Sequence, residues 1–165
     1  MKITAKISKV LEINNCNNEK LLRVLYKAEF WEAINPTKRM DAEFTAPNVL
    51  YTKIYDEVDV VKIPIEMEGE LVLSDKGKDQ NKGHLIEFNV RNNSNVRELE
   101  GRIRIKPLSP NKSKVGVFID IFSLSGDFLS KIGGVSDLVL QRKISEMLRN
   151  IEKYCKTKDL NDFLP

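Results

Sequence analysis

The sequence predicts an α+β domain in which a curved antiparallel sheet of six or seven strands wraps around a long C-terminal helix. Three observations lead to this fold class. From Val49 to Ser123, short runs of alternating or β-branched residues are separated by turn residues, which is typical of an antiparallel meander. Residues 136–155 carry one apolar stripe at helical spacing. Residues 19–34 predict two short helices after the first strand.

Composition bounds the class of protein. The chain has 165 residues, of which 41% are hydrophobic, enough for one packed core. We expect a single domain over residues 1–155 and a polar tail over 156–165. The 27 basic and 24 acidic residues are interspersed and leave a net charge of +3, so no strong field for nucleic acid is expected.

Location is predicted from what the sequence lacks. No window approaches the roughly 18 apolar residues of a membrane span, so no stable membrane insertion is expected. The first ten residues alternate and have no continuous apolar core of a signal peptide. We therefore expect a cytoplasmic protein in which Cys16 and Cys155 are reduced thiols.

The N-terminal third combines one strand and two helices. Residues 2–8 alternate, which predicts a half-buried strand. Apolar residues recur at helical spacing over 19–28, and the stripe then moves to the opposite side at Phe30, Trp31 and Ile34. One straight helix cannot bury both stripes, so we predict two helices with a kink near Ala28.

The rest of the sheet follows from alternation and turn composition. A polar hairpin loop is predicted over Ser74–Gly83. The strict alternation of residues 98–106 predicts that Leu99, Ile103 and Ile105 face the interior, while Arg102 and Arg104 face solvent. The predicted strands after the helices are residues 49–55, 58–63, 65–73, 84–91, 98–106 and 115–123.

This order of elements resembles the START-like superfamily with the helix-grip fold, which includes polyketide cyclase relatives, and within it small archaeal members. The resemblance covers residues 1–155. It rests on the segments EFWEAINPTKRM, LEGRIRIKPLSPNKSKVGVFIDI and GGVSDLVLQRKISEMLRNIEKY. It implies a cavity between the concave face of the sheet and the last helix, where members bind lipids or other apolar molecules.

Gly69 and Gly101 occupy predicted inward positions, where a missing side chain lets a sheet bend and leaves space. We therefore expect a hollow interior that binds a hydrophobic, lipid-like small molecule without catalysis and without a cofactor. A cyclase- or dehydratase-like enzyme acting on an aromatic or polyketide substrate, or a protein–protein interaction module, are the alternatives. The oligomeric state is left open. The predicted ligand-binding residues are Trp31, Met67, Leu71, Phe88, Leu99, Ile103, Phe118, Asp120, Leu140, Ile144 and Met147.

The role predicted for Asp120 depends on which face of strand 115–123 lines the cavity. If the face with Phe118 and Phe122 is inside, Asp120 is a charge in an apolar pocket and a candidate anchor or acid. If the face with Val115 and Val117 is inside, Asp120 is external.

No other motif predicts catalysis or a metal site. His84 is the only histidine, and we expect an ordinary surface position for it. The loop 75–79 lacks the spacing of a calcium or phosphate site. The acidic row Glu66, Glu68 and Glu70 and the basic row at 102–106 are interpreted as wet strand faces or cross-strand charge pairs.

Overall fold

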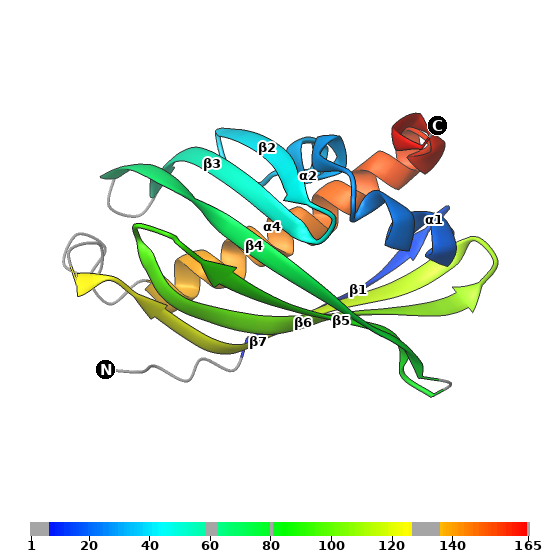
Figure 1. The fold of residues 1–165 in the computed structure, drawn as a ribbon. Coiled ribbons are helices and arrows are strands. Elements are labelled where there is room, and N and C mark those ends of the chain that lie inside the picture. The colour runs from blue at the N-terminus through cyan, green and yellow to red at the C-terminus, as the bar shows by residue number, and fades with distance from the viewer. Residues whose placement is uncertain (1–6, 59–62, 80, 127–135, 165) are drawn as a thin grey trace.

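A computed structural model describes residues 7–58, 63–79, 81–126 and 136–164 of the chain. One curved antiparallel sheet of seven strands wraps around the long helix α4 (Figure 1). The strands are β1 (Ile7–Asn14), β2 (Arg39–Ala46), β3 (Val49–Val58), β4 (Ile63–Asp79), β5 (Gly83–Arg91), β6 (Val96–Ser109) and β7 (Lys112–Leu124). The helices are α1 (Asn18–Val24), α2 (Ala28–Ile34), α4 (Ser136–Thr157) and the 3₁₀ helix η2 (Leu160–Phe163).

The strand order is β1-β7-β6-β5-β4-β3-β2, so the last six strands form a meander and β1 pairs with β7 at the far edge. The predicted α+β class and helix-grip architecture are confirmed. Residues 2–6 of the first predicted strand and most of the predicted strand 58–63 lie outside the described residues. Two predictions were wrong. Residues 39–46 form a strand that was not predicted, and the expected loop 74–83 is largely a continuation of β4 with a bulge between Asp75 and Gly77.

Helix α4 lies along the concave side of the sheet and contacts β1 and α2. Its buried stripe consists of Ile144, Leu148, Ile151 and Cys155, while its other side is polar. This confirms the predicted packing of the last helix on a sheet face. No helix within the described ranges is both long and apolar enough to cross a membrane.

Helices α1 and α2 cover one end of the concave face (Figure 1). The Asn17 side chain caps α1 by accepting from the backbone N–H of Lys20 at 3.0 Å. The chain between the helices is fixed by Trp31, whose Nε1 donates to the carbonyl of Leu25 at 2.8 Å. The two predicted short helices are confirmed, with the break at residues 25–27.

A bulge between β6 and β7 decides which side chains of β7 point inward. Gly101 pairs with Ile119, whereas Glu100 pairs with Ile121, so Asp120 is an extra residue on β7. Beyond the bulge, Phe122 and Leu124 are buried on the inner side.

The predicted register of β6 is confirmed. Ile103 and Ile105 are buried, and Leu99 is partly buried against the core. Arg102 and Arg104 on the alternate positions are partly exposed.

The C-terminal residues pack on the domain. Leu160 is buried, and the ring of Phe163 lies 5.4 Å from that of Phe30 and 5.0 Å from that of Tyr154, measured between centroids. Segment 158–164 therefore covers the end of α4 and one side of α2.

Candidate functional site

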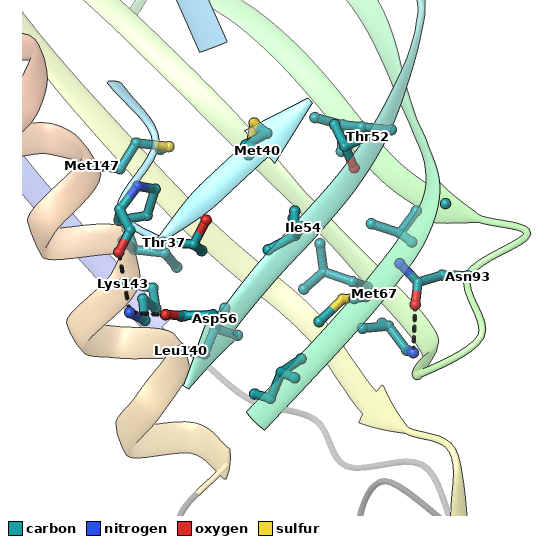
Figure 2. Close-up of a pocket in the computed structure, with 18 of the residues that line it drawn as sticks. Thr37, Met40, Thr52, Ile54, Asp56, Met67, Asn93, Leu140, Lys143 and Met147 are labelled. Atoms are coloured by element: carbon teal, nitrogen blue, oxygen red, sulfur yellow. Dashed lines mark hydrogen bonds and ion pairs between the residues drawn. The ribbon is translucent and has the colours of Figure 1, made fainter. Parts of the chain in front are cut away.

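A cavity of about 310 Å³ lies between α4 and the concave face of the sheet at strands β2 to β4 (Figure 2). Its volume is at the lower end of the range for small-molecule sites. At ~30 Å³ per water molecule, it has room for a ligand of on the order of ten non-hydrogen atoms. The cavity wall is almost wholly apolar.

Most of the predicted ligand-binding residues meet at this cavity. The predicted residues that line it are Trp31, Met67, Leu71, Leu99, Leu140, Ile144 and Met147. They come from α2, β4, β6 and α4, which the fold brings together although they are distant in sequence. Because Trp31 Nε1 is already bonded to Leu25, the part of Trp31 that faces the cavity is apolar.

Phe88 and Ile103 do not line the cavity and belong instead to the packed core beside it. The aromatic ring of Phe88 lies over Gly101: a Cβ placed there would be 2.7 Å from Phe88 Cζ. The inward space at Gly101 is therefore filled. Gly69 lines the cavity, but the Asn93 side chain occupies the space beside it, because a Cβ there would be 2.7 Å from Asn93 Nδ2. The prediction that these two glycines leave space was therefore wrong, although a cavity is present.

Phe118 and Asp120 lie outside the cavity, on the opposite face of the sheet. Arg102 binds both carboxylate oxygens of Asp120 at 3.1 Å, and its guanidinium lies 5.2 Å from the ring centre of Phe118. The Asp120 side chain is 49% exposed. Of the two possibilities for this strand, the interior face is therefore the one with Val115 and Val117.

The ion pair between Lys143 and Asp56 was not predicted. Lys143 Nζ lies 2.8 Å from Asp56 Oδ2 and donates to the carbonyl of Pro36 at 3.1 Å (Figure 2). All three residues line the cavity, and the side chains of Lys143 and Asp56 are only 23% and 9% exposed. The pair joins α4 to β3 at one side of the cavity.

The sequence did contain a signal for this pair. Asp56 is two residues after Ile54, so it continues the inward-facing positions of β3. Lys143 is three residues after Leu140 and one before Ile144, at the margin of the helical stripe. A charge on each of two apolar faces marks both residues as unusual, but their pairing depends on how α4 packs beside β3.

Two uncharged polar side chains at the cavity, those of Asn93 and Thr37, are hydrogen-bonded within the protein. Asn93 Oδ1 accepts from the N–H groups of Asn95 and Val96 at 2.9 Å each. The hydroxyl of Thr37 is hydrogen-bonded to Asn35 and to the carbonyl of Arg39. Of the three described lining residues that are charged, Lys143 and Asp56 pair with each other, whereas Glu70 pairs with Arg91, which does not line the cavity.

The remaining candidate groups lie away from the cavity, except for Glu70, which is one of its lining residues. His84 Nε2 is 2.6 Å from Asp75 Oδ1 across β4 and β5. Glu70 in the acidic row is bonded to Arg91 Nε at 3.1 Å, a cross-strand pair as predicted. In the described part of the chain, no three His, Cys, Asp or Glu side chains gather as a metal site would require.

Comparison of the sequence with protein-family models and with curated proteins gives no match. The fold, in contrast, is found in solved structures. A START superfamily protein from Mycobacterium smegmatis superposes with a TM-score of 0.66 at 15% identity, over 92% of this chain and 97% of the other.

Two enzymes share the fold. The Zhui aromatase/cyclase from Streptomyces sp. R1128 gives a TM-score of 0.59 at 11% identity, over 97% of this chain and 93% of its own. Norcoclaurine synthase from Thalictrum flavum gives a TM-score of 0.60 at 11% identity, over 94% of this chain and 88% of its own. The chain therefore has the helix-grip fold of START-superfamily proteins, a fold that these comparisons show both in a protein described only by its superfamily and in enzymes.

Proposed function

We propose that this protein binds and carries a hydrophobic small molecule in the cavity between α4 and the sheet, without chemical change to the ligand. The observation that carries the proposal is the cavity of about 310 Å³ with its almost wholly apolar wall. An apolar small molecule is the expected partner, and the cytoplasm is the expected location.

Burial of the ligand supplies the binding energy. Each ligand methylene moved from water to the apolar wall contributes on the order of 0.8 kcal/mol. Met67 and Met147 lie on facing walls, and their flexible side chains adapt to ligands of different shape. Selection by size and shape follows from such a wall.

A second candidate function is a cyclase- or dehydratase-like enzyme. It is supported by the Lys143–Asp56 pair, since an amine and a carboxylate beside a bound substrate can transfer protons. However, Lys143 is held by both Asp56 and the Pro36 carbonyl, which favours a role in binding over proton transfer. The fold comparisons include enzymes but give identities of 11–15%, so they support the fold and not the activity.

The proposal is tested by titration with the neutral fluorescent probe N-phenyl-1-naphthylamine. Leu140→Trp fills the cavity from α4, and Leu138→Trp is the matched control because Leu138 is 44% exposed on the same helix and does not line the cavity. We expect micromolar probe binding by the wild type and by Leu138→Trp, and a loss of at least tenfold in affinity for Leu140→Trp. Equal binding by both variants, or none by the wild type, would contradict the proposal. Binding without conversion of the ligand separates the carrier from the enzyme, and no binding favours an interaction module.

A further inference from the structure

We propose that the natural ligand is a neutral amphipathic molecule whose hydroxyl group binds the Lys143–Asp56 pair, and that fatty-acid anions are discriminated against. This inference rests on the proposed carrier function and specifies its ligand class. It starts from the position of the pair at the border of a cavity with an almost wholly apolar wall. Glu70, the other charged residue among the described lining residues, is paired with Arg91.

The net charge at this side of the cavity is close to zero. Lys143 Nζ and Asp56 Oδ2 are 2.8 Å apart and form a direct ion pair. A ligand carboxylate approaching Lys143 also approaches Asp56, and a ligand ammonium approaching Asp56 also approaches Lys143. Either charged head therefore meets a like charge beside its partner and gains little net attraction, while it loses its own hydration, which is unfavourable.

The pair still has hydrogen-bonding capacity for a neutral group. An ammonium has three N–H donors; Lys143 donates one to the carbonyl of Pro36, and its ion pair with Asp56 at 2.8 Å leaves at least one more open. Among the described residues, Asp56 Oδ1 accepts no hydrogen bond. One open donor beside one open acceptor matches a hydroxyl, which both accepts and donates.

The shape of the cavity gives the ligand tail a direction. In Figure 2, Lys143 and Asp56 lie beside α4, and Asn93 lies on the opposite side, with Ile54 and Met67 between them. A head group at the ion pair therefore directs the tail across β3 and β4. With room for on the order of ten non-hydrogen atoms, the cavity fits a medium-length chain or one or two small rings.

The experiment compares three ligands that share a ten-carbon tail: 1-decanol, decanoate and decylammonium. Each displaces N-phenyl-1-naphthylamine from the wild type at pH 7. We expect 1-decanol to bind about tenfold tighter than either ion, a ratio that corresponds to about 1.4 kcal/mol. Because this order is measured on the wild type, it does not depend on the folding of any variant.

Two substitutions then invert the charge preference. Asp56→Asn leaves the Lys143 charge unpaired, so the affinity for decanoate should rise relative to the affinity for decylammonium. Lys143→Met leaves the carboxylate of Asp56 unpaired, so the affinity for decylammonium should rise relative to the affinity for decanoate. Lys156→Met, an exposed lysine on the same helix that does not line the cavity, should keep the wild-type order.

The outcomes separate this inference from the carrier proposal. If none of the three ligands displaces the probe, and the probe itself does not bind, the carrier proposal fails. If all three bind within twofold of one another, if decanoate binds tightest, or if Asp56→Asn and Lys143→Met leave the order unchanged, the carrier function stands and the hydroxyl-selective site is wrong. If the ion pair were purely structural, the two substitutions would lower the affinity for all three ligands by the same factor.

Discussion

The thiols of Cys16 and Cys155 are both buried and each shifts the pKa of the other, although the two residues lie near opposite ends of the chain. Cys16 follows β1, where its N–H donates to the carbonyl of Asn111 at 2.8 Å and its own carbonyl accepts from Ser113 Oγ at 2.8 Å. Cys155 is in the last turns of α4. The thiol pair thus joins the end of β1, the β6–β7 turn and the C-terminal helix.

The first prediction concerns the titration of this pair. The hydrogen bond from Cys155 lowers the pKa of Cys16, and the same contact together with burial raises the pKa of Cys155. In Cys155→Ala, Cys16 loses this hydrogen bond but remains buried, so its pKa should rise. In Cys16→Ala, the pKa of Cys155 should fall while staying above its ordinary value because of burial. Thiolate absorbance measured against pH checks both changes; an unchanged Cys16 titration in Cys155→Ala would show that the hydrogen bond has no effect.

The second prediction concerns stability at high pH. Burial, and then the hydrogen bond of its hydroxyl to Asp162 at 3.1 Å, raise the pKa of Tyr154 from 10.0 to about 12. The unfolded chain releases this proton first, so the stabilisation is complete below pH 10 and is lost as pH rises through about 12. Urea unfolding at several pH values should show a steeper loss of stability over this window for the wild type than for Tyr154→Phe. Lysine titration is common to both proteins, so parallel curves would exclude the effect.

Alternation predicted most of the sheet because each inward position of a strand repeats every second residue. Residues 98–106 alternate without interruption, and Ile103 and Ile105 are buried as expected. Strand β2 has the same pattern in Met40, Ala42 and Phe44, but its alternation includes the small Ala42 and its apolar residues are only partly buried, so the signal is weak.

The parts of the site that sequence did not predict depend on contacts between distant segments. The bulge at Asp120 shifts the period of β7 by one residue, so Phe122 faces inward and Phe118 does not. The Lys143–Asp56 pair forms only when α4 packs beside β3. Neither feature follows from the local pattern, because both require the pairing partner.

The third prediction tests the exterior position of Asp120. Its ion pair with Arg102 involves side chains that are 49% and 38% exposed, respectively, and exposed pairs contribute about 0–1 kcal/mol. Asp120→Asn should therefore change the free energy of unfolding by less than about 1 kcal/mol. It should leave the affinity for the probe and the order of the affinities for 1-decanol, decanoate and decylammonium unchanged, in contrast to Asp56→Asn. A large loss of probe affinity in Asp120→Asn would place this carboxylate at the ligand after all.

The fourth prediction contrasts the two inward glycines. A Cβ at Gly101 would lie 2.3 Å from the backbone carbonyl oxygen of Phe118, which cannot move without disturbing β7. A Cβ at Gly69 would meet the side chain of Asn93 at 2.7 Å, at the cavity wall. Gly101→Ala should cost about 1–3 kcal/mol of unfolding free energy, as overpacking does, with little effect on probe affinity per folded molecule. Gly69→Ala should lower the affinity for the probe more than Gly101→Ala does, and should cost less unfolding free energy. The opposite ranking would contradict the placement of the cavity.

The fifth prediction links ligand binding to stability. A ligand that binds only the folded state at a hundred times its Kd adds about 2.7 kcal/mol to the free energy of unfolding. For a domain of this size, that corresponds to a rise in Tm of roughly 5–10 °C. Thermal unfolding with 1-decanol should show this rise for the wild type and for Leu138→Trp, and little or none for Leu140→Trp, because only Leu140 lines the cavity. Non-specific adsorption of the alcohol to the surface would shift the Tm of both tryptophan variants equally, so a shared shift would count against a ligand held between α4 and the sheet.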